Sequence, residues 1–152
     1  MSVAARPLAG VLASAGLAVA AYLSVVHYAQ GEVPLACASS GLVNCELVTS
    51  SAQSTLGPAP VAVLGLAWFA GMLALVAFEE RLQESAILAA ELVWTVGGLI
   101  VALYLVFAEL FLIGAICSWC TLVHLVIVLL FLLTVFRITG ATGAISRPGE
   151  TR

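Results

Sequence analysis

Hydrophobic residues in this chain fall into four long runs, separated by shorter stretches that are richer in polar residues and turn formers. The runs cover about residues 7–28, 60–78, 86–108 and 117–136. A helix needs about 20 apolar residues to cross a bilayer, and each run is close to that length. An unclosed strand would leave its backbone groups unpaired in lipid, so we expect helices. The pattern predicts an all-α integral membrane protein with a single domain, residues 1–137, folded as a four-transmembrane-helix bundle.

Composition agrees with this assignment. The chain has 152 residues, of which 63% are hydrophobic and only 9% are charged. Soluble domains carry roughly 25% charged residues. The sequence contains no internal repeat, no second domain and no nucleotide-binding loop. We therefore expect the lipid bilayer as surroundings and no nucleic acid as a partner.

The basic residues predict how the bundle is oriented. The chain has no lysine, and its five basic side chains are Arg6, Arg81, Arg137, Arg147 and Arg152. All five fall on one side of a four-span chain, and the positive-inside rule makes that side cytoplasmic. Both termini are then cytoplasmic, and the loop 29–59 and the turn 109–116 are extracytoplasmic. We expect a multi-pass protein of the cell inner (plasma) membrane.

The two ends of the chain carry features that the four apolar runs do not explain. The first run contains Ala18-Val19-Ala20, a small-x-small sequence of the kind found at signal-peptide cleavage sites. Its apolar stretch is longer than a typical signal peptide and has no polar break there, so we expect a retained transmembrane helix. Residues 138–152 are rich in Gly, Thr and Ser, and we expect them to form a disordered cytoplasmic tail.

Four cysteines carry the candidate chemistry. Cys117 and Cys120 form a CxxC motif at the outer start of the last run, and Cys37 and Cys45 lie in the loop 29–59. Two sulfurs within one helical turn can close a disulfide, and the helix dipole stabilises the thiolate that carries out the exchange. The predicted orientation places both pairs where disulfides persist. This pattern favours redox-active cysteines.

Two other roles for the cysteines stay open. A zinc site made of all four thiolates fits the count, but it needs four deprotonated thiols on the oxidising side, and the C-x7-C spacing is unusual for zinc. Two inert disulfides in a non-enzymatic tetraspan scaffold also fit. A disulfide that closes a loop as short as CxxC removes little chain entropy, so it suits opening and closing better than stabilisation. We expect redox activity and no metal.

Polar side chains near the CxxC motif are further candidates. Trp119 lies at the level of the membrane interface, where anchoring is the ordinary role of tryptophan. His124 follows one helical turn later on the same face, and it could bond a quinone carbonyl, relay a proton or bond another helix. Glu109 ends the third run near the same surface. Glu91 is expected near Arg81 at the inner end of that run, as a snorkelling or capping carboxylate.

The loop 29–59 has its own predicted structure. Residues 45–53 are expected to form a short interfacial helix whose first turn is capped by Asn44. Its apolar side would lie on the bundle as a lid and comprises Leu47, Val48 and Leu56. The sequence Gly57-Pro58-Ala59-Pro60 then breaks the chain before the second run. Such a lid would hold one cysteine pair above the other.

These elements are similar to a known family over nearly the whole chain. In chain order they are the C-x7-C pair Cys37 and Cys45, Ser51, the sequence GPxPVAVLG at residues 57–65, Glu109-Leu110-Phe111, and Ala115-Ile116-Cys117-Ser118-Trp119-Cys120. Together they resemble the bacterial form of the vitamin K epoxide reductase family. The resemblance implies an oxidoreductase that acts on dithiols with a quinone as acceptor.

The resemblance also implies a path for the electrons. Cys37 would exchange disulfides with an extracytoplasmic thioredoxin-like (DsbA-like) partner, and Cys45 would pass the electrons on to Cys117. Cys120 would then reduce a membrane quinone, menaquinone or ubiquinone. The protein would thereby support disulfide bond formation.

Other residues and the physiological role follow from the same resemblance. Ser51 and His124 are expected near the quinone ring. Human-type members have tyrosine at the position of His124, which disfavours vitamin K epoxide itself as substrate. Trp119 is a further quinone-binding candidate, on its position between the two CxxC cysteines. Many bacterial members carry a fused thioredoxin-like domain, which this sequence lacks, so the partner is expected in trans. Two alternatives stay open, a dithiol-driven quinone or vitamin K epoxide reductase and the non-enzymatic tetraspan scaffold.

Overall fold

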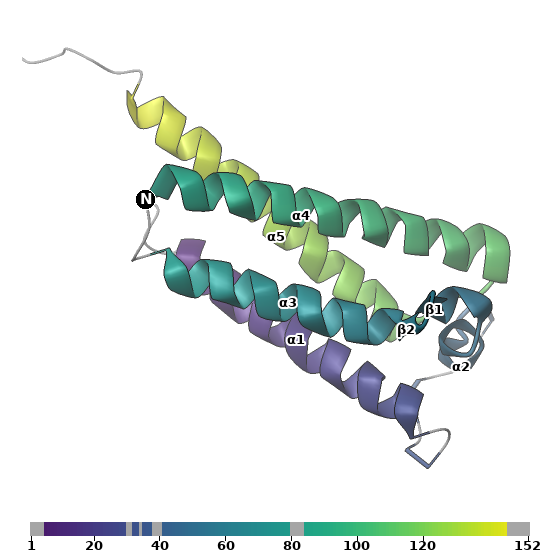
Figure 1. Cartoon of the computed structure of the whole chain (residues 1–152). Coiled ribbons are helices and arrows are strands. Elements are labelled where there is room, and N and C mark those ends of the chain that lie inside the picture. The colour runs from purple at the N-terminus through teal and green to yellow at the C-terminus, as the bar shows by residue number, and fades with distance from the viewer. Residues whose placement is uncertain (1–4, 30–31, 34, 38–40, 80–83, 146–152) are drawn as a thin grey trace, which may run out of the picture.

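The computed structural model describes residues 5–29, 32–33, 35–37, 41–79 and 84–145. Their long helices are α1 (Ala5–Tyr28), α3 (Val61–Phe78), α4 (Glu84–Phe107) and α5 (Ser118–Ile145). These helices run side by side along one axis (Figure 1). Within the described residues, four helical segments are long and apolar enough to cross a membrane. The predicted all-α four-helix membrane bundle is confirmed.

The helix ends differ from the sequence prediction in two places. The third span does not stop at residue 108, because α4 continues as a π-helix, η2 (Ala108–Ile113), up to Gly114. The fourth span continues as one helix to Ile145, so residues 138–145 are helical and the prediction of disorder from residue 138 is wrong for them. Glycine and threonine lower helix propensity without forbidding a helix, and the first proline after the span is Pro148. Residues 146–152 lie outside the described part of the chain.

Small residues bring the helices close together in the core. The buried side chains shared by α1, α3 and α5 include Ala9, Ala13, Ala20, Phe69, Met72 and Leu130. A Cβ atom added to Gly16 would lie 2.2 Å from the ring of Phe69, so only glycine leaves room for this ring. Phe69 itself is fully buried. Close packing of this kind, rather than hydrophobic transfer, holds helices together in lipid.

Ion pairs join the four long helices at one end of the bundle. Arg137 on α5 bonds Glu91 on α4 at 2.7 Å and also bonds Glu79, the residue that ends α3. Arg6 on α1 lies 3.6 Å from the same Glu79 carboxylate. We call these four residues the arginine cluster. Glu91 is 0% exposed and pairs with Arg137, so the expected snorkelling or capping role is wrong for it; Arg81 lies outside the described residues.

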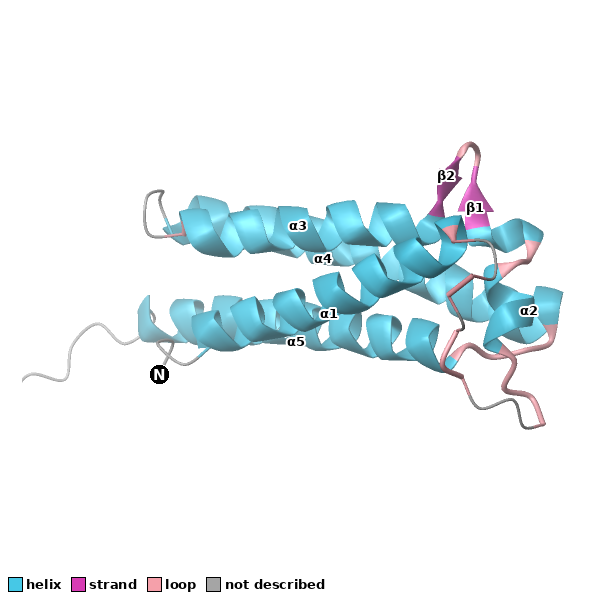
Figure 2. Cartoon of the chain, turned by 90° about the horizontal axis from the view of Figure 1, so that it is seen from below, coloured by secondary structure: helices cyan, strands magenta, loops and turns pink. Residues whose placement is uncertain are grey.

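The opposite end carries a small cap made from the loop between α1 and α3. It contains α2 (Cys45–Thr49), the 3₁₀-helix η1 (Ala52–Ser54), and the strands β1 (Thr55–Leu56) and β2 (Ala59–Pro60), which pair through a tight turn. Figure 2 shows this cap at the end away from the N-terminus. Gly57 has φ +62°, a left-handed conformation that suits glycine in such a turn.

The predicted interfacial helix is present but shorter than expected. Asn44 caps α2 by accepting a hydrogen bond from the Leu47 amide at 3.0 Å, as predicted. The helix ends at Thr49, and the hydroxyls of Thr49, Ser50 and Ser51 bond backbone carbonyls of the preceding turn. Of the three apolar side chains expected to form the lid, only Val48 is buried, whereas Leu47 and Leu56 are exposed. The lid prediction is therefore wrong for Leu47, whereas Leu56 lines the cavity between the cap and the bundle.

Candidate functional site

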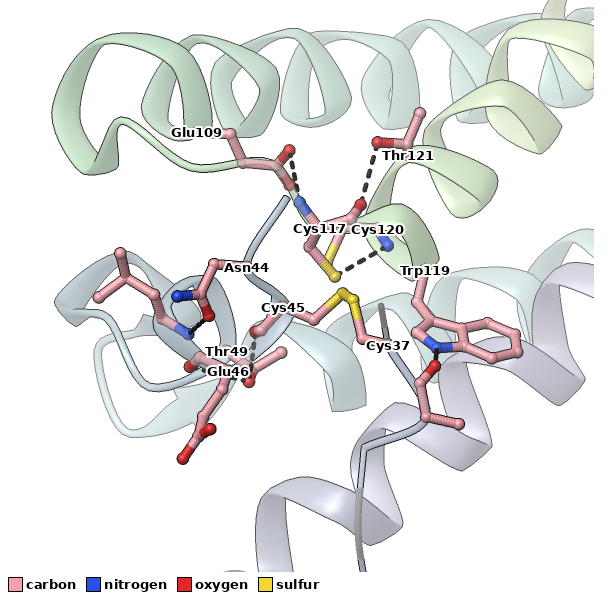
Figure 3. Close-up of a disulfide and its surroundings, with 12 residues drawn as sticks. Cys37, Asn44, Cys45, Glu46, Thr49, Glu109, Cys117, Trp119, Cys120 and Thr121 are labelled. Atoms are coloured by element: carbon pink, nitrogen blue, oxygen red, sulfur yellow. Dashed lines mark hydrogen bonds between the residues drawn. A yellow bond between two sulfur atoms is a disulfide. The ribbon is translucent and has the colours of Figure 1, made fainter. Parts of the chain in front are cut away.

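The two cysteine pairs lie together beneath the cap. Cys37 and Cys45 form a disulfide with Cα atoms 6.1 Å apart, and Cys117 and Cys120 are thiols. Cys45 is 1% exposed and Cys117 is 0% exposed, and both belong to one buried cluster. Figure 3 shows the Cys117 sulfur pointing toward the disulfide. The structure therefore brings together all four cysteines that the sequence singles out.

A single backbone bridge fixes how the pairs face each other. Val43 and Ile116 form an isolated parallel bridge. The Asn44 amide donates to the Ile116 carbonyl at 3.1 Å, and the Ile116 amide donates to the Leu42 carbonyl at 2.9 Å. Cys45 follows Val43 by two residues, and Cys117 follows Ile116 directly. The bridge therefore keeps Cys45 and Cys117 next to each other. Sequence analysis missed it because a one-residue bridge has no periodic pattern.

Cys117 occupies the N-cap position of α5. Its sulfur accepts a hydrogen bond from the Cys120 amide at 3.3 Å, and its carbonyl accepts from the Thr121 amide at 2.8 Å. The pKa of the Cys117 thiol is lowered, chiefly because the Cys120 thiol donates a hydrogen bond to it. Burial and the nearby Glu109 carboxylate oppose this effect. In the reduced pair, Cys117 is thus the sulfur better suited to be a thiolate.

Glu109 faces the CxxC motif from the π-helix η2. Its side chain is buried, and its Oε2 atom accepts a hydrogen bond from the Cys117 amide at 3.4 Å. Its backbone carbonyl also accepts hydrogen bonds from the amides of Gly114 and Ala115. Gly114 has φ +72°, so the chain reverses there and returns past Glu109. Sequence analysis places Glu109 near the motif but does not predict this contact.

An apolar cavity of about 750 Å³ extends from the cap into the bundle. Of the described cysteines, Cys120 alone contributes to its wall. His124 and Ser51, both predicted near a quinone ring, also line it. His124 is buried, and its Nδ1 atom has no hydrogen-bond partner among the described residues. A cavity of this size and polarity suits an apolar ring compound that a few polar groups orient.

Trp119 lies outside the cavity wall, beside the start of the loop between α1 and α3. Its indole N–H donates to the Ala36 carbonyl at 2.8 Å, and its ring packs against Tyr22 with centroids 5.2 Å apart. It does not line the cavity. The side chain therefore ties the start of the loop to α1 and α5, and the structure does not bring it to His124 and Ser51.

Two tryptophans form part of the cavity wall farther into the bundle. Trp68 on α3 and Trp94 on α4 each donate the indole N–H to the backbone carbonyl of the other, at 3.2 and 3.1 Å. A Cβ atom on Gly71 would lie 2.5 Å from Trp94, and one on Gly98 would lie 2.5 Å from Trp68. Sequence analysis missed this pair, although a tryptophan with a glycine three or four residues later occurs on both helices.

Comparison with known proteins agrees with this geometry. A family model described as the vitamin K epoxide reductase family matches residues 7–135, which include both cysteine pairs. The search of curated proteins found no match. Members of this family are thiol oxidoreductases that act on quinone-type substrates, and they generally pair with thioredoxin-like proteins. The resemblance predicted from the sequence is confirmed, and the chain belongs to the vitamin K epoxide reductase family.

Proposed function

We propose that the protein oxidises an extracytoplasmic thioredoxin-like (DsbA-like) partner and passes the two electrons to a membrane quinone, menaquinone or ubiquinone. Its role is to support disulfide bond formation. One observation carries the proposal: the loop disulfide and the CxxC thiols share a buried cluster, and Cys120 lies in the wall of an apolar cavity. The cluster gives a path for thiol exchange, and the cavity gives room for the acceptor.

The proposed orientation rests on the arginines. Arg6 and Arg137 both belong to the arginine cluster, at the end of the bundle away from the cysteines. Under the positive-inside rule this end is cytoplasmic, in the cell inner membrane. The cap and all four cysteines then face the oxidising side, where a secreted partner can reach them.

The electrons pass from the partner to the quinone in three steps. A partner thiolate attacks the Cys37 sulfur, the partner's second thiol resolves the mixed disulfide, and Cys37 and Cys45 become thiols. Cys45 then attacks a Cys117–Cys120 disulfide at Cys117, and Cys37 resolves the bond to restore the loop disulfide. The structure holds the loop disulfide together with the CxxC thiols, the combination that this step leaves behind. The CxxC thiols then reduce the quinone to a hydroquinone and close their own disulfide.

His124 and Ser51 are the residues we propose to orient the quinone. A quinone carbonyl accepts hydrogen bonds, and a buried imidazole with an unpartnered Nδ1 can supply one. The Ser51 hydroxyl donates to the Val48 carbonyl at 2.7 Å, so it would turn to reach the ring. Both side chains share the cavity with Cys120, which keeps the acceptor beside the reacting sulfur and away from water.

Partner exchange at Cys37 can be tested by trapping. The probe is a thioredoxin-like protein with a single active-site cysteine, activated as a mixed disulfide with nitrothiobenzoate. In a Cys45→Ala variant, Cys37 should displace nitrothiobenzoate and form a stable protein–protein disulfide, because no Cys45 remains to resolve it. Release of the coloured thiolate and a non-reducing gel measure the reaction.

The matched control is Cys37→Ala, which leaves Cys45 as the loop thiol. Because Cys45 is buried and Cys37 is partly exposed, we expect Cys45→Ala to react at least about tenfold faster than Cys37→Ala. Equal rates, or faster capture by Cys45, would contradict the assigned order. Absence of capture in both variants would favour a scaffold with inert disulfides.

A further inference from the structure

We propose that Glu109 supplies one of the two protons that the quinone takes up when the CxxC pair reduces it, an inference that rests on the proposed function. A quinone takes two electrons and two protons to become a hydroquinone. The sulfurs supply the electrons, but a Cys117 thiolate brings no proton of its own. The second proton needs a holder inside the site, because the cavity wall is almost entirely apolar.

Position and burial make Glu109 suited to this task. Its side chain is 5% exposed, and the described residues offer it no ion-pair partner. The one hydrogen bond to its carboxyl group that the structure describes comes from the Cys117 amide. A buried carboxyl group without a cation can take up and release a proton as the charge beside it changes. The arginine cluster shows the contrast, because Glu91 there is fixed by Arg137 at 2.7 Å.

The carboxyl group reaches both the thiol pair and the acceptor site. It contacts Cys117 through the backbone amide, and it lines the same cavity as Cys120 and His124. The turn at Gly114 sets this placement, because the chain there folds the CxxC motif back onto the π-helix. Glu109 therefore lies between the sulfur that carries charge and the cavity in which charge would develop on the quinone oxygens.

Among the described residues, the charged and titratable groups around Glu109 and its cavity come from four elements. On α1, His27 lines the same cavity. On α5 and its N-cap these groups are Cys117, Cys120 and His124. From α4, Tyr104 lines the same cavity, and on α2 the nearest charged residue is Glu46, which is exposed to solvent. None of them is a permanent cation. A negative charge on both Glu109 and Cys117 would be unfavourable. We therefore expect one of the two groups to be ionised while the other keeps its proton.

The step balances with this proton in place. The reactants are a Cys117 thiolate, a Cys120 thiol, a protonated Glu109 and a quinone. The S–H bond of Cys120 and the O–H bond of Glu109 break, a Cys117–Cys120 disulfide forms, and two O–H bonds form on the quinone. The two electrons come from the two sulfurs. One negative charge enters on Cys117 and remains afterwards on the Glu109 carboxylate.

The test compares Glu109→Gln with wild type in two assays. Single-turnover reduction of a short-chain ubiquinone by the pre-reduced protein measures the full step. Alkylation of Cys117 by iodoacetamide without quinone, read by mass spectrometry, measures its thiolate. Glutamine still accepts the Cys117 amide hydrogen bond but cannot carry the proton. Glu109→Asp is the conservative variant, and Glu32→Gln, in the exposed loop, is the control.

We expect Glu109→Gln to slow quinone reduction by about 100-fold. Alkylation of Cys117 should stay close to the wild-type rate, because a neutral amide replaces a neutral carboxylic acid beside the thiolate. The wild-type rate should fall at alkaline pH as Glu109 loses its proton to water, and the variant should lack this limb. Glu109→Asp should recover part of the rate, and Glu32→Gln should match wild type.

Two results would overturn the inference while the proposed function stands. An unchanged rate and pH profile in Glu109→Gln would show that Glu109 is only a hydrogen-bond acceptor. A parallel loss of quinone reduction and of Cys117 alkylation would show that it only positions the motif. If wild type and Glu32→Gln also fail to reduce quinone, the proposed function itself is wrong, and the inference falls with it.

Discussion

Replacing Cys120 with alanine is expected to abolish quinone reduction and leave the four-helix bundle intact. Cys120 is the one described cysteine in the cavity wall, so the quinone has no other sulfur beside it. We expect the single-turnover rate to fall at least about 10³-fold, toward the uncatalysed reaction. The measurement is the loss of quinone absorbance after mixing with the pre-reduced protein, together with helix content by circular dichroism.

Cys37→Ala provides the matched control for this loss. Cys37 lies at the outer end of the proposed path, so a chemically reduced CxxC pair should still reduce one equivalent of quinone in that variant. The same variant should fail with a reduced thioredoxin-like protein as the only electron donor. Normal turnover in Cys120→Ala, or loss of the single turnover in Cys37→Ala, would contradict the proposed order of electron transfer.

The largest loss of stability is expected from Arg137→Ala. This arginine bonds Glu91 on α4 and Glu79 at the end of α3, and Glu91 is fully buried. Removing the guanidinium leaves two carboxylates without their main cation. Breaking a buried pair in this way costs about 3–5 kcal/mol. Denaturant or thermal unfolding in detergent, followed by circular dichroism, measures the change in the free energy of unfolding.

Arg6→Ala is the comparison variant within the same cluster. Arg6 lies farther from Glu79, at 3.6 Å, and its side chain is 33% exposed. We expect its replacement to cost less than about 1 kcal/mol. A double variant, Glu91→Leu with Arg137→Met, should recover much of the stability lost in Arg137→Ala, because no buried charge is left without a partner on α4. Equal losses for Arg6→Ala and Arg137→Ala would contradict this account of the cluster.

The transmembrane helices could be predicted from sequence because their signals are local. Each apolar run is long enough to span a bilayer on its own, and Asn44 caps α2 through a contact three residues away. Helix ends are harder to predict. Gly140 and the threonines around it suggest a flexible tail, yet α5 continues to Ile145 because the preceding turns are already formed and each further residue adds a hydrogen bond at little cost.

The site could be predicted only in part, because its geometry depends on contacts between distant segments. The cysteines are recognisable from their spacing, and His124 from its polarity within an apolar span. The π-helix that directs Glu109 toward Cys117 leaves no comparable pattern in the sequence. The place of Trp119 depends on Ala36, a residue 83 positions away in the chain. Such long-range contacts are set by packing rather than by composition.

The central claim is that electrons pass from a thioredoxin-like dithiol through both cysteine pairs to a quinone. The most direct measurement uses the purified protein in lipid nanodiscs, a reduced thioredoxin-like protein and a short-chain quinone, and it records both products over time. We predict one hydroquinone for each partner disulfide formed, and no reaction with Cys37→Ala or Cys120→Ala. Partner oxidation without hydroquinone, or equal turnover in either variant, would contradict the claim.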